Sequence, residues 1–269
     1  MEAFEIFQLQ LIQRAYIVGL VLAAAIPCIG VMSVLKRLSM MGDTLAHSSL
    51  AGVALGFIFG FNPTICAAAY CIAAAGAIEF LRHKFPQYAD ISLAIIMSTG
   101  VGLAGVLSGY LPATANFTNF LFGSIAAVPN SEFYLSICIG AVVLGTFFLL
   151  YKEVFFIIFD EQGARLAGVP VAAINFIFMI LTATIIAVAA RTVGALIVSS
   201  LMVLPVACAM QIARNFRQTV FASISFSVLF MLIGLTISCF SDAKPGGTIA
   251  LTGVSILTLI LVIKGCLKR

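Results

Sequence analysis

The run Met40-Met41-Gly42-Asp43-Thr44-Leu45-Ala46-His47-Ser48-Ser49-Leu50-Ala51-Gly52 decides the fold of this chain. It belongs to an apolar segment that is long enough to cross a membrane, yet it contains one acid and one imidazole. Asp43 and His47 are four residues apart, so on a helix both side chains lie on one face. Ionisable groups at membrane depth usually line a pathway or bind an ion, although such a pair can also join two helices. Both interpretations place this run on a membrane helix.

Composition indicates an all-α polytopic membrane protein. Hydrophobic residues make up 62% of the 269 residues and charged residues only 9%, whereas about 25% of the residues of a soluble domain are charged. Lipid allows only helices or closed barrels, and the apolar runs are too long for barrel strands. The formal charge of +4 is spread over short loops, so it reports orientation and predicts no nucleic-acid partner.

The cysteines and the N-terminal segment carry no further motif. The seven cysteines contain no CxxC pair, so neither a disulfide framework nor a zinc knuckle is indicated. The first apolar segment is long and has no small-residue cleavage site after it, which is not typical of a cleavable signal.

Eight to nine apolar segments are predicted to span the membrane, and nine can be delimited in the sequence. A short amphipathic lead-in over residues 1–13 precedes them. Residues 112–131 contain an apolar core that is too short to span, so we expect a re-entrant or interfacial helix there. The nine predicted spans are residues 15–35, 38–61, 64–80, 91–111, 132–151, 171–190, 193–212, 219–240 and 248–264.

The basic residues predict the orientation of these spans, because cytoplasmic loops are enriched in Lys and Arg. With the N-terminus outside and the C-terminus inside, only three basic residues lie outside: Arg14, Arg191 and Lys244. The other eleven of the fourteen lie inside: Lys36, Arg37, Arg82, Lys84, Lys152, Arg165, Arg214, Arg217, Lys264, Lys268 and Arg269.

Asp43 and His47 are candidate metal ligands. Counted from residue 38, His47 lies roughly 14 Å into a hydrocarbon core about 30 Å thick, near the midplane. Carboxylate suits manganese, and imidazole suits zinc, iron and nickel. Two ligands do not complete a site, and the remaining candidates are more simply explained as loop or helix-end residues: Glu79, Asp90, Asp242, Met40 and Met41.

The polar segment 152–170 is the second informative stretch. Within it, residues 159–170 read Phe-Asp-Glu-Gln-Gly-Ala-Arg-Leu-Ala-Gly-Val-Pro, which predicts a short amphipathic helix that ends at the Gly-Val-Pro run. On the cytoplasmic face such a helix can dock a partner, or it can be an ordinary interfacial connector.

No glycine-rich Walker A loop occurs in the sequence, and no nucleophile with a paired base stands out. We therefore expect a transport subunit and not an enzyme. If transport uses ATP, hydrolysis takes place on another chain.

Taken together, these residues resemble the permease subunits of bacterial ABC transporters for zinc, manganese and iron, and the zinc-uptake permeases in particular. The resemblance covers essentially the whole chain, residues 1–269, as one transmembrane permease domain. It rests on the run 41–56, on Leu121-Phe122-Gly123-Ser124-Ile125, on residues 160–168 and on Arg191-Thr192-Val193-Gly194-Ala195-Leu196-Ile197-Val198-Ser199-Ser200-Leu201-Met202-Val203-Leu204-Pro205.

The resemblance implies a multi-pass protein of the bacterial inner membrane that works as a homodimer or paired permease with one central path. It implies two further partners, a separate ATPase subunit and an extracytoplasmic metal-binding protein that delivers the ion. Zn²⁺, Mn²⁺ or Fe²⁺ would be cargo, and no cofactor of the chain's own is implied. Asp43 and His47 become the expected metal contacts, and the expected ATPase contacts are Asp160, Glu161, Ala164 and Gly168.

An ATP-driven importer of divalent metal, with zinc preferred, is the leading hypothesis. The alternative is a proton-coupled secondary metal carrier in which Asp43 holds the proton. Such carriers usually show broken helices or internal repeats, and the sequence indicates neither.

Overall fold

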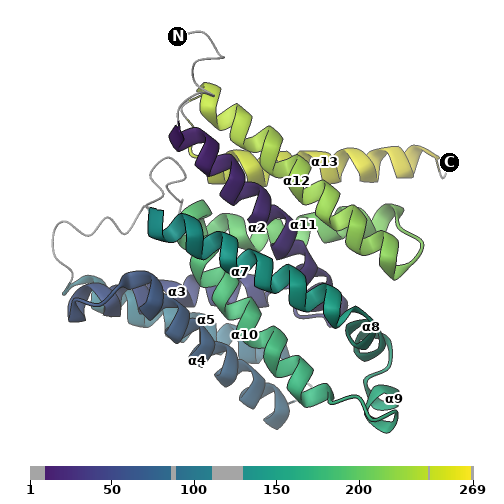
Figure 1. The fold of residues 1–269 in the computed structure, drawn as a ribbon, viewed down its shortest axis with the longest axis horizontal. Coiled ribbons are helices and arrows are strands. Elements are labelled where there is room, and N and C mark those ends of the chain that lie inside the picture. The colour runs from purple at the N-terminus through teal and green to yellow at the C-terminus, as the bar shows by residue number, and fades with distance from the viewer. Residues whose placement is uncertain (1–9, 86–88, 111–129, 242, 268–269) are drawn as a thin grey trace.

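The structure is a computed structural model that describes residues 10–85, 89–110, 130–241 and 243–267. These residues form helices joined by short turns, and no strand occurs among them, so the all-α prediction is confirmed (Figure 1). The helices are α2 (Gln10–Leu35), α3 (Met41–Phe59), α4 (Pro63–Lys84), α5 (Ala89–Ser108), α7 (Asn130–Leu149), α8 (Tyr151–Phe159), α9 (Glu161–Leu166), α10 (Val171–Ala189), the π-helix η3 (Ala190–Gly194), α11 (Ala195–Ile212), α12 (Phe216–Ser241) and α13 (Pro245–Leu267).

A long helix occupies each of the nine predicted spans, within a few residues at each end. Seven of them are long and apolar enough to cross a membrane, which leaves out α3 and α11. The apolar part of α11, Ile197–Ile212, is shorter than the others. The predicted interfacial helix at 112–131 lies outside the described residues except for its last two, which begin α7. Residues 10–13, predicted to belong to the lead-in, are instead the first turn of α2.

Helix α3 lies inside the protein, which explains why it is less apolar than its neighbours. It packs against α4, α5, α10 and α11, and most of its residues are buried. A helix surrounded by protein does not need lipid-facing side chains, so it can carry small and polar residues such as Thr44, Ser48 and Ser49. At the periphery the proportions reverse, and only 17% of the apolar window of α13 is buried.

Glycines let α3 approach its neighbours closely. A Cβ atom on Gly52 would lie 2.7 Å from Ala67 Cα, and one on Gly56 would lie 2.7 Å from Pro63 Cα, so the C-terminal half of α3 is in backbone contact with the N-terminal half of α4. On another face, a Cβ atom on Gly100 of α5 would lie 2.7 Å from Ser48 Cα. Helices α3, α4 and α5 therefore form one tightly packed unit.

Local signals explain where the helices around α3 begin and end. Arg37 takes a left-handed conformation with φ 59°, and Leu38 N–H donates to Ser33 O at 2.7 Å, which ends α2 in a tight turn. Pro63 stands at the first position of α4, and the side chain of Asn62 accepts a hydrogen bond from Thr64 N–H at 2.9 Å. The short turn after α2 puts the beginning of α3 next to Lys36.

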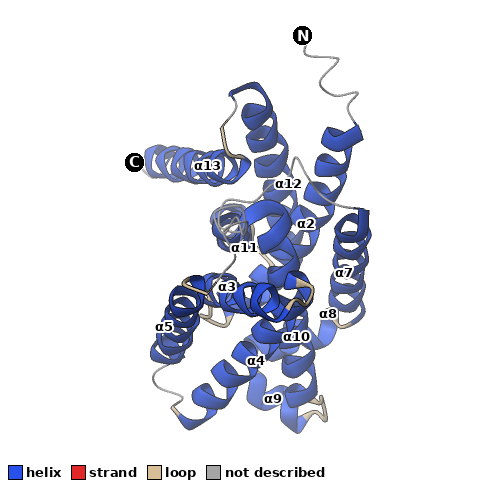
Figure 2. Ribbon diagram, turned by 90° about the vertical axis from the view of Figure 1, so that its left-hand side faces the viewer, coloured by secondary structure: helices blue, strands red, loops and turns tan. Residues whose placement is uncertain are grey.

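Helix α11 lies at the centre, between two groups of helices (Figure 2). It packs against α2, α12 and α13 and also against α3. The chain enters α11 through η3, whose last residue, Gly194, has φ 107° and ψ 143°, a conformation that favours glycine. This sharp turn reverses the chain between α10 and α11.

Candidate functional site

Asp43 and His47 share one face of α3, as their spacing predicts. The Nε2 atom of His47 lies 3.5 Å from the Oδ1 atom of Asp43, and the side chains are 21% and 27% exposed. Neighbouring positions on α3 are buried, so this pair is the place where the inner half of the helix opens to its surroundings. Because both side chains are partly exposed, an ion at the surface of this chain can contact both of them.

The pair is nearer to the inner end of α3 than the sequence predicted. The helix begins at Met41 and not at residue 38, so His47 lies about 9 Å along the helix axis. Gly42 lets α11 come close at this point, because a Cβ atom there would lie 2.6 Å from Met202 Sδ and 3.7 Å from Ser199 Cα. The pair therefore lies where α3 and α11 adjoin.

The other candidate ligands do not gather around Asp43 and His47. Glu79 pairs with Arg82, with 3.2 Å between Oε1 and Nη2, and Met40 is exposed. Asp90 lies in the first turn of α5. Met41 lines a small hollow with Glu79, and Asp242 lies outside the described residues. Over the described part of the chain, no group of three or more His, Cys, Asp or Glu side chains could hold a metal ion. Asp43 and His47 thus remain the two candidate ligands, and a carboxylate with an imidazole suits a divalent first-row metal.

The short amphipathic helix predicted in the polar segment is confirmed as α9. Asp160 precedes it, and its Oδ1 accepts a hydrogen bond from Gly163 N–H at 2.8 Å, which caps the helix. A Cβ atom on Gly163 would collide with the Asp160 carboxylate, so a larger residue there would displace the capping side chain. At the other end, Gly168 has φ 82° and lets the chain turn away. Two of the four predicted ATPase contacts, Asp160 and Gly168, thus also shape this helix.

The remaining two predicted contacts differ in exposure. Ala164 is fully buried and packs in a core cluster with Val154 and Ile157, so it holds α9 against the protein. Glu161 is 38% exposed and pairs with Arg165 at 2.8 Å. Leu166, which the sequence analysis did not single out, is 90% exposed at the end of α9. Its position as the only apolar long side chain of the EQGARL helix was a signal that could have identified it.

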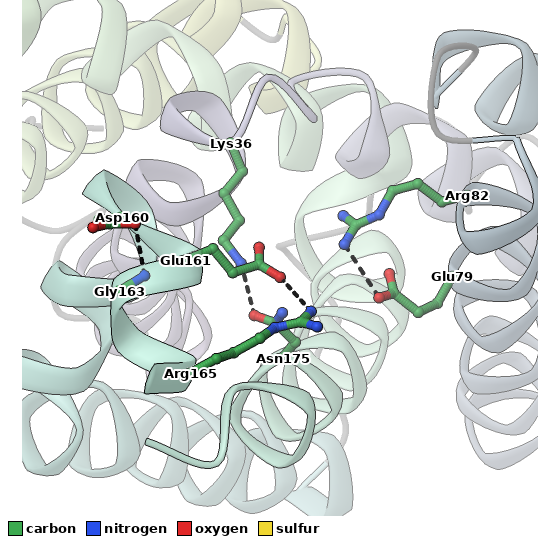
Figure 3. A network of polar contacts seen from close by, with 8 residues as sticks. All are labelled: Lys36, Glu79, Arg82, Asp160, Glu161, Gly163, Arg165 and Asn175. Atoms are coloured by element: carbon green, nitrogen blue, oxygen red, sulfur yellow. Dashed lines mark hydrogen bonds and ion pairs between the residues drawn. The ribbon is translucent and has the colours of Figure 1, made fainter. Parts of the chain in front are cut away.

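Charged side chains from α4, α9 and the turn after α2 meet Asn175 of α10 near α9 (Figure 3). Lys36 follows α2, and its Nζ donates to Asn175 Oδ1 on α10 at 2.7 Å. Burial lowers the pKa of the Lys36 ammonium, and the nearby Glu161 carboxylate partly offsets that effect. A hollow of about 120 Å³ is lined by both ion pairs, Glu79–Arg82 and Glu161–Arg165, and by Asn175. We call these residues with Lys36 the inner cluster.

A second set of polar contacts lies at the opposite ends of these helices. Arg191 of η3 pairs with Glu132 at the beginning of α7, with 2.6 Å between Nη2 and Oε1, and also donates to Thr64 at the beginning of α4. We call these three residues the outer cluster. Two residues before Glu132, the side chain of Asn130 of α7 accepts a hydrogen bond from Arg14 of α2. The sequence analysis counted Arg191 only as a charge outside, because its partners are distant in the chain.

Comparison with known proteins gives a consistent family. Residues 8–264 match the ABC 3 transport family. A Treponema pallidum protein named a probable metal transport system membrane protein is 33% identical over 95% of this chain and 96% of its own length. The Haemophilus influenzae high-affinity zinc uptake system membrane protein ZnuB is 32% identical, with 92% of this chain and 95% of that protein covered. The Listeria monocytogenes manganese transport system membrane protein MntC is 28% identical, with coverages of 93% and 90%.

A solved structure has the same fold. PsaBC from Streptococcus pneumoniae, in complex with a Fab, superposes with a TM-score of 0.85 at 26% identity. The match covers 96% of this chain and 93% of that one, so the arrangement of the helices is shared over nearly the whole length.

Proposed function

We propose a transport function for this chain, which belongs to the ABC 3 transport family. It is the membrane-spanning permease subunit of an ATP-driven importer of divalent transition metal in the bacterial inner membrane. Family membership and the full-length likeness to ZnuB and MntC support this function over the proton-coupled carrier. The chain contains no Walker A loop, so a separate ATPase subunit supplies the energy.

The Asp43–His47 pair is the observation that carries the choice of cargo. A carboxylate and an imidazole 3.5 Å apart on a helix surrounded by protein form part of a coordination shell for Zn²⁺, Mn²⁺ or Fe²⁺. Zinc is the cargo that we propose first, because the zinc-uptake relative is 32% identical and the manganese relative 28%. An incomplete shell also suits transport, since an ion held in a full rigid cage would not leave.

A second copy of the chain would complete the site. One protomer offers only two side-chain ligands, and a transported ion needs two to four more. The partial exposure of both side chains supports a site shared between two copies, in which each contributes Asp43 and His47. We therefore propose a homodimer with one central path, and each pair lies on the wall of that path.

Nine spans with the N-terminus outside are the topology that we propose. Helix ends that this topology assigns to one side do meet, as Lys36 with Asn175 and Lys264 with the Gln211 carbonyl at 2.8 Å show. Only four residues separate the end of α4 from the beginning of α5, and α7 begins beside Arg14, near the start of α2. These contacts support the same side for the end of α5 and the start of α7.

The partners would bind at opposite ends. On the cytoplasmic side, α9 within segment 152–170 is the proposed docking site for the ATPase. It presents Glu161 and the exposed Leu166 there, and Asp160, Ala164 and Gly168 hold its shape. The extracytoplasmic metal-binding protein would deliver the ion to the end that carries the outer cluster.

Metal uptake tests the function and the site together. Cells that lack their own importer would express this chain with its ATPase and binding protein, as wild type, as His47→Ala and as His83→Ala. The second variant is a matched control because it removes the chain's other histidine. We expect zinc accumulation to fall below about one tenth of wild type in His47→Ala alone, because an embedded ligand is lost while little packing changes.

Equal amounts of folded protein in the membrane must accompany that result. Uptake by His47→Ala at the wild-type level would remove His47 from the path. Accumulation of manganese or iron in place of zinc would correct the cargo and leave the site assignment intact.

A further inference from the structure

Two ion pairs face each other across the hollow of the inner cluster. Glu79 and Arg82 are three residues apart near the end of α4, and Glu161 and Arg165 are four residues apart on α9. Each helix thus presents one acid and one base to the same hollow of about 120 Å³. In Figure 3 the two pairs lie on separate ribbons with open space between them.

The present pairing is easily exchanged. Both pairs join residues of one helix, and such pairs contribute only about 0.3–0.5 kcal/mol each. If α9 moved toward α4, Glu79 could pair with Arg165 and Arg82 with Glu161. Charges would then be matched as well as before, but the pairs would join two helices. When two arrangements have similar free energy, a small difference in interaction free energy is enough to switch the protein from one to the other.

The inner cluster also connects α9 to the turn that precedes α3. A second hollow, of about 40 Å³, is lined by Glu79, Arg82, Lys36 and Met41, the first residue of α3. Asn175 lines both hollows and accepts the hydrogen bond from Lys36 Nζ. The same side chains therefore adjoin α9, α10, α4 and the start of the helix that carries Asp43.

Movement of α4 would carry α3 with it. The backbone contacts of Gly52 and Gly56 with α4 leave no room for one helix to slide past the other without a shift of both. A displacement at the inner end of α4 is thus transmitted to Asp43 and His47 by rigid packing, over the length of one helix.

From this geometry we propose that Glu79 and Arg82 are the residues through which α9 moves the metal-site helix. On ATP-driven movement of α9 the hollow closes, the two pairs within helices are replaced by Glu79–Arg165 and Arg82–Glu161, and α4 takes α3 with it. Glu79 and Arg82 act as positioning residues, because neither contacts the ion. The proposal rests on the proposed function of α9 as the ATPase docking helix.

Two double variants with reversed charges distinguish an exchange of ion-pair partners between α4 and α9 from ion pairs that stay within each helix. Glu79→Arg with Arg82→Glu keeps the pair within α4 but places like charges opposite α9. Glu79→Arg with Arg165→Glu breaks both pairs within helices but keeps both pairs between helices. The two variants have the same net charge and the same number of substitutions, so each is the control of the other.

Metal uptake per ATP hydrolysed would be measured in proteoliposomes that contain the complete transporter. We expect at least a tenfold loss for the first double variant. We expect the second to regain uptake to within about threefold of wild type, well above Arg165→Glu alone. Normal uptake by the first double variant, with failure of the second, would overturn the exchange. Binding of the ATPase to every variant is measured separately, so that a docking defect is not mistaken for lost transmission.

Cross-linking gives a readout that does not depend on the cargo. In a complex that carries Arg82→Cys and Glu161→Cys, a disulfide should form at least tenfold faster with a trapped ATP analogue than without nucleotide. Each single cysteine variant controls for the seven native cysteines. An equal rate in both states would overturn the proposal even if metal is transported. Faster cross-linking without uptake of any metal would support the movement and contradict the proposed cargo.

Discussion

The outer and inner clusters are built from similar side chains but are connected differently. At the outer end, Arg191 bonds directly to Glu132 and Thr64, so one guanidinium joins η3, α7 and α4. At the inner end, Arg82 and Arg165 each pair with an acid of their own helix, and a hollow separates the two pairs. The ion pair of the first arrangement joins two helices, whereas the two ion pairs of the second join no helix to another.

The exposed fractions of the paired side chains also differ between the outer and inner clusters. Glu132 is 12% exposed and Arg191 26%, whereas Glu161 is 38% and Arg165 59% exposed. The other inner pair is intermediate, with Glu79 28% and Arg82 23% exposed. Ion pairs that are shielded from water are stronger and less screened than those on the surface. The most exposed of these pairs, Glu161–Arg165, is thus the one on α9, the proposed ATPase docking helix.

The largest expected effect comes from Arg191→Met, with Arg82→Met as its counterpart at the inner end. Loss of Arg191 leaves the mostly buried Glu132 without its ion-pair partner, which should destabilise the protein by about 3 kcal/mol and lower the Tm by roughly 6–12 °C. Arg82→Met should cost less than about 1 kcal/mol, because its pair lies within one helix. Thermal unfolding of the purified variants in detergent measures both. Equal shifts in Tm would remove the distinction between the two ends.

A smaller effect is expected from Gly52→Ala, compared with Gly76→Ala. A Cβ atom at Gly52 would lie 2.7 Å from Ala67 Cα and Cys66 O, so overpacking should destabilise the outer half of α3 by about 1–3 kcal/mol. Gly76, on the inner half of α4, has nothing within 4 Å of an added Cβ, and alanine there should be neutral or stabilising by up to about 1 kcal/mol. The same unfolding experiment measures both. Tolerance of alanine at Gly52 would mean that α3 and α4 can separate.

The smallest expected effect concerns the surface that the inner end exposes. Leu166→Ala should leave the Tm unchanged, because the side chain is 90% exposed, but should weaken ATPase binding about tenfold if Leu166 anchors that partner. Leu149→Ala is the control, since that leucine is 82% exposed at the inner end of α7. Affinity for the purified ATPase is measured for both variants. Equal affinities would direct attention to other residues of α9.

The positions of the long helices could be predicted because each apolar run is continuous and bounded by charged, Asn or Pro residues, such as Asn62-Pro63. The shared helix face of Asp43 and His47 could be predicted from their spacing of four residues. The start of the helix did not follow from hydropathy, because α3 begins three residues later than the predicted span, after the turn at Arg37.

Contacts between distant segments could not be predicted. The bias of basic residues assigned Lys36, Arg82 and Arg165 to one side, but not to one cluster, since spacing in the chain says nothing about which loops meet. Arg191 likewise needed Thr64 and Glu132, which are 127 and 59 positions away, before its role was visible. Burial of Ala164 depended on a core formed with Val154 and Ile157 of α8, which a helical pattern of six residues does not reveal.

The enclosure of α3 has a consequence for biogenesis. A helix that carries Asp43 and His47 in its first two turns gains less when it enters lipid alone than a wholly apolar helix does, since ionisable side chains oppose insertion. We therefore expect the insertion machinery to retain α3 until α4 has been synthesised, so that the two enter the bilayer as a hairpin. The feature that allows the helix to carry an ion site would also make it depend on its neighbour from the moment of synthesis.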